Sequence, residues 1–459
     1  MSDQDLTELT IAEASALIAD GSLSPVALTE AYLARIADVD PELNAYTTLA
    51  DDRARKQAEQ AEEELSHGVR RGPLHGIPIG LKDLIDTADV RTTSGSALRR
   101  DHFPEEDATV AAKLRAGGAV LLGKHATHEW AWGGTTNNPH FGPTRNPHDA
   151  ERVPGGSSGG SAASVVARTS LASVGTDTCG SVRIPAALCG CVGLKPTYGR
   201  ISLTGVTPLG PSFDHVGPIT RTVADAALMY ELLAGADPTD ERTGRLPAVE
   251  VPVLGGDVTG VRVRRLLGWA EAIIDPAVRA GVDRAAAALG EIGAVVEAVE
   301  MPDQGPLVDR IFTLVHAEAE PWHRAAFGRD ASAFGPDLTV NLSRPPADPV
   351  TLARVRAELA STTDWLMARL EDAQILMLPT VPALAPRIGT EHVEVAGHEL
   401  HVEWMLTRLT SLFNLTGLPA ITLPGRAGPG LPVGVQLVAR HNDEATLLRV
   451  ADALERAMS

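Results

Sequence analysis

Residues 154–161 of this 459-residue chain read Pro-Gly-Gly-Ser-Ser-Gly-Gly-Ser, and residues 175–185 read Gly-Thr-Asp-Thr-Cys-Gly-Ser-Val-Arg-Ile-Pro. Both segments place serine among glycines, whose backbone adopts conformations closed to other residues and can approach a reacting group closely. A third segment, residues 76–83, reads Gly-Ile-Pro-Ile-Gly-Leu-Lys-Asp and sets one lysine in an otherwise apolar run. Serine hydroxyls with a lysine as candidate base predict nucleophilic catalysis that needs neither histidine nor a metal ion.

The sequence around these three motifs alternates between strand and helix patterns. Short apolar runs predict buried strands, at residues 77–81, 119–122, 171–174, 264–269, 294–299 and 375–379, with two more between 418 and 438. The stretches between them predict helices, at residues 107–118, 161–167, 276–292 and 444–458, whereas residues 383–402 predict a long loop or hairpin. This alternation predicts an α/β protein in which helices cover a sheet.

No repeat, low-complexity tract or linker divides the chain, so we expect one large domain over residues 1–459. Its N-terminal segment, about residues 6–67, is expected to be helical. The three motifs lie in a core segment of about residues 75–225. A further segment, within about residues 306–412, is expected to be mostly helical.

Charge and composition exclude several classes of protein. The 40 basic and 59 acidic residues give a net charge of −19, which argues against binding to nucleic acid or to an anionic membrane. Residues 1–5 are polar and acidic, unlike a secretory signal, and no apolar run approaches the ~18 residues of a spanning helix. The three cysteines (Cys179, Cys189 and Cys191) indicate no disulfide framework, so we expect reduced thiols in a cytoplasmic protein.

The first serine segment on its own is compatible with several kinds of site. Gly155-x-Ser157-x-Gly159 matches the nucleophile elbow of α/β-hydrolases, which also require a later acid and a catalytic histidine. Seven histidines follow this segment, so the order of residues leaves that alternative open. A phosphate-binding loop is disfavoured because no lysine follows Gly160.

Taken together, the motifs closely resemble the amidase signature family. The resemblance rests on the three segments above and extends to other parts of the chain, at residues 141–147, 189–197, 214–221, 413–419 and 430–436. It covers the chain from about residue 10 to the C-terminus. It implies a single large domain with a central mixed β-sheet covered by helices, and a site that uses no cofactor and no metal.

The resemblance implies a catalytic role for one residue of each motif. Ser181 corresponds to the nucleophile, Ser157 to a bridging serine that follows a cis peptide bond after Gly156, and Lys82 to the base. The chemistry is consistent, because a serine hydroxyl attacks only when a base takes its proton. A lysine has an ordinary pKa near ~10.4, and burial among apolar groups lowers that pKa until the neutral amine can act as the base.

The turn into Ser181 implies an oxyanion hole made of backbone amides, those of Thr178, Cys179, Gly180 and Ser181. Asp177 and Arg183 are expected to form an ion pair or hydrogen-bond network that holds this turn, with binding of an anionic substrate as the alternative for Arg183. Ser158 is expected to provide a structural hydroxyl. The family usually shows glycine at the position of Cys179. That thiol is either a tolerated small residue or an influence on the choice of substrate.

Residues 130–134 read Trp-Ala-Trp-Gly-Gly and form a candidate wall of the substrate pocket. Trp130, Trp132, Gly133 and Gly134 are the expected pocket residues, with core packing as the alternative for the two tryptophans. The nearby His125 and His128 match neither H-E-x-x-H nor its inverse, so no metal site is expected. Substrate specificity is expected to come from this loop and from the variable segment of about residues 306–412.

The resemblance implies an amidohydrolase that cleaves a carboxamide C–N bond through an acyl-enzyme on Ser181. Esters, anilides and carbamates (urethanes) are further expected substrates. A first alternative is the glutaminase subunit of a tRNA-dependent amidotransferase, which uses the same triad for a partner protein. A second is a non-catalytic binding module on the same fold. The expected partners are a small amide substrate and, as a possibility, a second copy of the chain in a homodimer.

Overall fold

The computed structural model describes residues 6–327, 333–425 and 430–459. The expectation about residues 1–5 therefore concerns a segment outside the described residues. The same holds for residues 328–332 of the variable segment.

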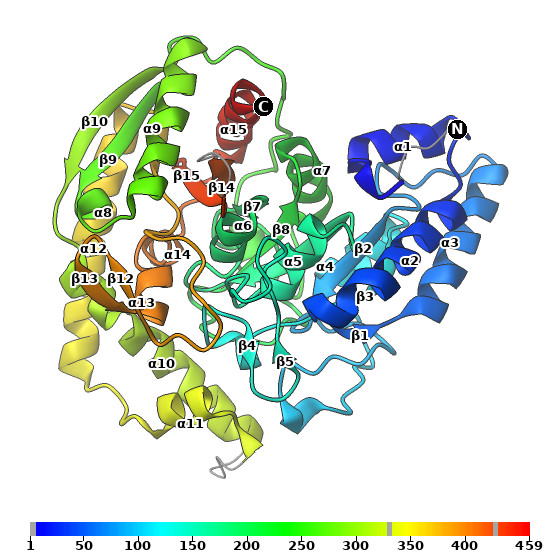
Figure 1. Cartoon of the computed structure of the whole chain (residues 1–459), viewed down its shortest axis with the longest axis horizontal. Helices are drawn as coiled ribbons and strands as arrows, with labels where there is room; N and C mark the ends of the chain where they lie inside the picture. The colour runs from blue at the N-terminus through cyan, green and yellow to red at the C-terminus, as the bar shows by residue number, and fades with distance from the viewer. Residues whose placement is uncertain (1–5, 328–332, 426–429) are drawn as a thin grey trace.

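Among the described residues, eleven strands form one mixed sheet through the middle of the molecule (Figure 1). In spatial order they are β1 (Tyr46–Leu49), β3 (Val120–His125), β2 (Pro78–Lys82), β6 (Ala172–Asp177), β8 (His215–Thr220), β7 (Val192–Lys195), β14 (Ala420–Gly425), β15 (Val433–Val438), β11 (Ile375–Pro379), β9 (Arg262–Gly268) and β10 (Val295–Met301). This arrangement confirms the expected single α/β domain with a central mixed sheet.

Strand direction places the catalytic candidates at one edge of this sheet. β2 is parallel to both β3 and β6, so the carboxyl ends of these three strands meet. β2 ends at Lys82 and β6 ends at Asp177, immediately before the turn that carries Ser181. In a sheet with parallel strands this edge is the usual location of a binding site.

Helices pack around the sheet (Figure 1). The longer ones are α1 (Ile11–Ala19), α2 (Pro25–Leu43), α3 (Asp51–Ser66), α4 (Thr109–Ala116), α5 (Gly159–Val166), α6 (Arg183–Cys189), α7 (Val223–Leu233), α9 (Pro276–Glu291), α10 (Gly305–Phe327), α11 (Pro336–Ser343), α12 (Pro349–Glu371) and α15 (Glu444–Met458). The short ones are α8 (Trp269–Ala272), α13 (Val402–Thr407) and α14 (Leu412–Leu415). In Figure 1, α1–α3 lie at the right and α10–α12 at the lower left.

Local sequence signals explain where several helices begin. The Thr10 hydroxyl accepts the Glu13 amide while the Glu13 carboxylate accepts the Thr10 amide, which forms a capping box at α1. Ser24 caps α2, which then starts at Pro25, a residue whose fixed φ suits the first helical position. Such caps satisfy amides that would otherwise lack partners inside the helix.

Most predicted elements are present, with differences where pairing partners are distant in sequence. The strand β1 (Tyr46–Leu49) lies inside the segment that we expected to be helical, and it pairs with β3, which follows much later in the chain. Within residues 383–402 the predicted hairpin alternative is the correct one, because β12 (His392–Val395) pairs with β13 (His398–His401). A two-stranded ribbon of β4 (Asn137–Asn138) and β5 (Gly142–Pro143) was also missed, as were β7 and β8 of the central sheet. Short strands carry weak local signals, so only their partners define them.

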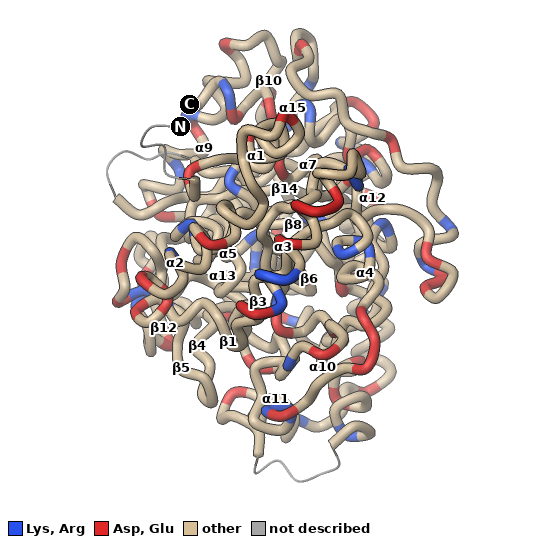
Figure 2. The backbone as a smooth tube through the Cα atoms, turned by 90° about the vertical axis from the view of Figure 1, so that its right-hand side faces the viewer, with Lys and Arg blue, Asp and Glu red and all other residues tan. Residues whose placement is uncertain are grey.

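Figure 2 shows basic and acidic residues intermingled on the side of the molecule that it presents. Among the described helices, none is both long and apolar enough to cross a membrane.

Candidate active site

Lys82 lies at the end of β2 and is completely buried. Its ammonium nitrogen is 2.7 Å from the Ser157 hydroxyl oxygen and 2.7 Å from the Thr176 hydroxyl oxygen. Burial lowers the Lys82 pKa from 10.5 to about 7, against the opposing charges of Asp177 and Asp214. A lowered pKa leaves part of the amine neutral near pH 7, which the base role expected from the sequence requires. The Thr176 contact was not predicted.

Gly80, two residues before Lys82 on β2, lies against the imidazole of His125. A β-carbon at Gly80 would lie 2.1 Å from the imidazole of His125, so only glycine fits beside that ring. The His125 Nδ1 lies 2.8 Å from the Ser173 hydroxyl, and burial lowers the His125 pKa to about 3. The absent side chain at Gly80 thus makes room for a neutral imidazole.

The first serine segment forms the entry to α5 and brings Ser157 to Lys82. The Gly156–Ser157 peptide bond is cis, as the resemblance implied. Ser158 joins this segment to the second one, because its hydroxyl donates to the Thr176 carbonyl (3.1 Å) and its amide donates to the Ser181 carbonyl (3.2 Å). The two serine segments are therefore bonded to each other directly.

Ser181 is the hydroxyl that faces the large cavity. It lies in the turn between β6 and α6 and lines a cavity of about 700 Å³. In the described part of the chain its hydroxyl has no hydrogen-bond partner, whereas Ser157 is fully buried and does not line the cavity. Of these two serines, only Ser181 therefore lines the cavity, and Ser157 lies against Lys82.

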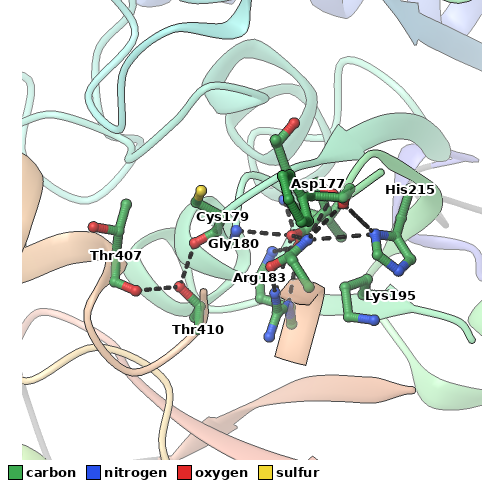
Figure 3. A network of polar contacts seen from close by, with 12 residues as sticks. Asp177, Cys179, Gly180, Arg183, Lys195, His215, Thr407 and Thr410 are labelled. Atoms are coloured by element: carbon green, nitrogen blue, oxygen red, sulfur yellow. Dashed lines mark hydrogen bonds and ion pairs between the residues drawn. The ribbon is translucent and has the colours of Figure 1, made fainter. Parts of the chain in front are cut away.

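Asp177 holds the turn that carries Ser181 (Figure 3). Its carboxylate accepts the amides of Gly180 (2.8 Å) and Val182 (3.1 Å), and it pairs with the Arg183 guanidinium at 3.0 Å. Burial by itself would raise the Asp177 pKa, but the Arg183 charge and hydrogen bonds hold it well below its ordinary value. The ion pair predicted between Asp177 and Arg183 is therefore present, and both partners are fully buried.

This arrangement corrects one expected oxyanion donor. The Gly180 amide points at the Asp177 carboxylate rather than at the cavity, so Gly180 is not a donor. Gly180 instead permits the turn, with a φ of 124° and no space for a side chain beside Thr410. The amides of Thr178, Cys179 and Ser181 remain as candidate donors.

Two amide side chains that we did not predict complete the support of this turn. The Asn414 amide group donates to the Asp177 carbonyl and to its carboxylate, both at 2.7 Å. The Arg183 guanidinium donates to the oxygens of Asn414 and Gln436, both at 2.6 Å. Both partners come from the C-terminal part of the chain, far from Asp177 in sequence. Their only sequence signal is that they fall in segments that resemble the family.

Cys179 lies beside Ser181 and lines the cavity. Its carbonyl accepts the Thr410 hydroxyl at 2.6 Å (Figure 3). Burial, with the charges of Asp177 and Asp214, raises the pKa of the Cys179 thiol well above its ordinary value. The thiol is therefore protonated at neutral pH and is no competing nucleophile.

The loop of residues 130–134 only partly matches its expected role. Trp132, Gly133 and Gly134 line the cavity, as predicted. Trp130 does not line it, which corrects its assignment as a pocket residue: it is fully buried, and its ring packs on Trp322 and Phe327 at centroid distances of 5.7 and 4.7 Å.

The variable segment supplies much of the opposite cavity wall. Cavity-lining residues within it are Phe312, Val315, Pro336, Asp337, Val340, Asn341, Arg344, Pro386, Arg387, Gly389, Thr390, Glu391, His401, Val402, Glu403, Trp404 and Thr407. In the described ranges, no group of three or more His, Cys, Asp or Glu side chains is arranged to hold a metal ion.

Comparisons with known proteins show what the whole chain is similar to. A family model described as Amidase matches residues 27–448. The A subunit of glutamyl-tRNA(Gln) amidotransferase from Roseiflexus sp. (strain RS-1) is 37% identical over 477 residues, which cover 98% of this chain and 96% of that protein. Among solved structures, "An unexpected vestigial protein complex reveals the evolutionary origins of an s-triazine catabolic enzyme" matches with a TM-score of 0.92 and 36% identity over 98% of both chains. Native peptide amidase from Stenotrophomonas maltophilia matches with a TM-score of 0.84 and 32% identity, over 98% of this chain and 97% of that one.

Proposed function

Since this chain belongs to the amidase signature family and is a hydrolase of that family, we propose that it cleaves carboxamides through an acyl-enzyme on Ser181. The observation that carries this proposal is the buried Lys82 amine, 2.7 Å from the Ser157 hydroxyl, behind a cavity that Ser181 faces. A neutral amine in that position can accept a proton near pH 7.

In the first half of the reaction the Ser181 oxygen attacks the amide carbon. The Ser181 proton passes to Ser157, whose own proton passes to Lys82. The carbonyl oxygen becomes an oxyanion, and in this proposal the amides of Thr178, Cys179 and Ser181 stabilise it. The C–N bond then breaks as the proton returns through Ser157 to the leaving nitrogen, because an amide anion is too poor a leaving group.

In the second half, water replaces the leaving amine. Its proton follows the same route to Lys82 while its oxygen bonds to the acyl carbon. The acyl–oxygen bond to Ser181 breaks, and the proton returns to Ser181. The carboxylic acid product then leaves the cavity.

We propose a substrate that is the amide of a small or medium acid, with esters, anilides and carbamates as further acyl donors. The apolar cavity residues Trp132, Phe312 and Val315 support an acyl group with an apolar part. In this proposal the chain acts without a cofactor. A cytoplasmic location, the absence of nucleic-acid binding and a homodimer stay predictions.

The second candidate is a glutaminase subunit of a tRNA-dependent amidotransferase, and the curated relatives favour it over a free-standing amidase. The supporting observation is the 37% identity to amidotransferase A subunits over nearly the full length of both chains. This candidate predicts glutamine hydrolysis and co-purification with partner subunits. A non-catalytic module on the same fold is disfavoured because Lys82, Ser157 and Ser181 are all present.

One screen separates these candidates. The purified chain would be assayed with primary amides, anilides, carbamates, esters and glutamine, with Ser181→Ala as the matched control, and the acyl adduct would be located by mass spectrometry. Turnover of simple amides with an adduct on Ser181 supports the first candidate, and turnover restricted to glutamine supports the second. No turnover of any acyl donor contradicts the first candidate, and it contradicts the second as well if no partner subunit co-purifies. A large loss with a chelator contradicts the metal-free mechanism.

A further inference from the structure

One carboxylate in the wall of the catalytic cavity has no cationic side chain opposite it. Glu403 lies at the start of α13 and lines the cavity. In the described residues, no Lys, Arg or His lies within ion-pair distance of the Glu403 carboxylate. Of the two cavity arginines, Arg387 pairs with Glu151, and Arg344 forms no ion pair with a described carboxylate. A half-buried carboxylate without a counter-charge is costly, so its retention in a cavity points to a ligand.

The orientation of this carboxylate is fixed by the opposite side of the cavity. One Glu403 oxygen, Oε2, accepts the Gly134 amide at 2.6 Å. A β-carbon at Gly134 would lie 3.1 Å from the same oxygen, a tight contact that would displace the carboxylate by a few tenths of an ångström. The second oxygen, Oε1, has no partner in the described part of the chain. Glu403 therefore holds one acceptor in place for a bound molecule.

The ionisable groups around Glu403 do not neutralise it. His128 lies 3.4 Å from Asp337, so its imidazole is engaged by another cavity carboxylate. His401 accepts the Glu403 backbone amide rather than contacting its carboxylate. Burial raises the Glu403 pKa. The charges of His128 and His401 lower that pKa, and the charge of Asp337 raises it further. This wall of the cavity is thus acidic and lacks a fixed cation.

Glu403 and Ser181 line the same cavity, so one bound substrate can contact both. Its charge is one of the causes that raise the pKa of the Cys179 thiol, after burial and the charges of Asp177 and Asp214. Cys179 is two residues from the nucleophile and lines the same cavity. A substrate acylated on Ser181 can therefore extend past Cys179 toward the free oxygen of Glu403.

We propose that Glu403 binds an ammonium group on the acyl chain, so that the preferred substrates are carboxamides whose acyl part carries a primary amine. This inference rests on the proposed amide hydrolysis. The ammonium supplies the missing counter-charge and donates a hydrogen bond to Oε1. A charge-assisted hydrogen bond in a cavity of low dielectric favours this substrate over a neutral one of the same shape.

The test compares pairs of primary amides that differ only at the end of the acyl chain. Each ω-amino amide with three to six carbons is paired with the alkyl amide in which methyl replaces ammonium, for example 5-aminopentanamide with hexanamide. We expect the wild-type chain to prefer the amine in at least one pair by about 10- to 100-fold in kcat/KM. Glu403→Gln keeps an acceptor for the Gly134 amide, and it should remove that preference while changing hexanamide turnover less than about threefold.

The matched control is Glu391→Gln, which neutralises an exposed carboxylate at the same cavity and should leave the preference intact. Equal turnover of both members of every pair by the wild-type chain would overturn the role of Glu403 while leaving amide hydrolysis intact. An equal loss of kcat/KM for both members of a pair in Glu403→Gln would also overturn the role of Glu403. Absence of turnover for every amide, with glutamine included, contradicts the proposed function itself.

Discussion

The pH dependence of catalysis is the sharpest test of Lys82 as the base. With a pKa of about 7, half of the Lys82 side chains are neutral at pH 7. A lysine with its ordinary pKa of 10.5 would be neutral in only about one molecule in 3,000 at that pH. Burial at the end of β2 therefore raises the amount of active base by about three orders of magnitude.

The expected profile follows from that value. Because only neutral Lys82 accepts the proton, kcat/KM should rise with pH along a one-proton limb with an apparent pKa of about 7. At pH 5 it should be about 1% of its plateau, and at pH 6 about 10%. The assay is initial-rate hydrolysis of one amide between pH 5 and pH 9, at substrate concentrations well below KM.

Lys124 provides the matched control for this profile. It is another fully buried lysine, on β3, and burial lowers its pKa to about 8. Lys124→Met should keep the limb near pH 7, whereas any residual hydrolysis by Lys82→Ala should lack it. A flat profile between pH 5.5 and pH 8, or a limb that survives in Lys82→Ala, would refute Lys82 as the base.

Three further predictions concern the same site. Ser181→Ala and Ser157→Ala should each lower kcat by at least about 10³-fold, but only Ser181→Ala should abolish the acyl adduct seen by mass spectrometry; an adduct in that variant contradicts Ser181 as the nucleophile. Asp177→Asn leaves the buried Arg183 unpaired and should lower the free energy of unfolding by about 3–5 kcal/mol in urea titrations; a loss under about 1 kcal/mol contradicts this support of the turn. The Lys82 pKa is about 7 in the folded state and 10.5 in the unfolded state, so the wild type loses stability as the pH falls from 10.5 to 7. Lys82→Met lacks this amine and should therefore gain stability relative to the wild type over that pH range. The free energy of unfolding of Lys82→Met minus that of the wild type should increase by about 3 kcal/mol from pH 9.5 to pH 7. A value that does not change with pH contradicts the lowered pKa.

The sequence was sufficient to predict most strands of the sheet, most helices and the identity of the candidate triad, but not β1, β7 or β8. Apolar runs such as those of β6, β9 and β11 are detectable locally, because a buried strand needs continuous apolar residues. β1 could not be predicted, since its pairing with β3 is a long-range contact that so short a strand does not encode. The capping residues of α1 and α2 were readable, because each cap acts within three or four residues of sequence.

Other features of the site depend on distances that no local pattern contains. The Gly180 amide was expected in the oxyanion hole, yet its turn directs it to the Asp177 carboxylate. Trp130 and Trp132 are two residues apart, but the backbone at Trp130 has a φ of 53°, and that ring turns into the core while Trp132 lines the cavity. Asn414 reaches Asp177 only because the fold brings together segments from distant parts of the chain.

The sequence by itself determined which chemical groups are available: two serines among glycines and a lysine in an apolar strand. Residue type and local backbone freedom suffice for that, because they set what each group can do chemically. Only the tertiary structure decided how the groups differ in role. It buried Lys82 deeply enough to lower its pKa, exposed Ser181 but not Ser157 to the cavity, and left Glu403 without a counter-charge. Burial, accessibility and charge balance are properties of the packed chain, because each depends on residues far apart in sequence.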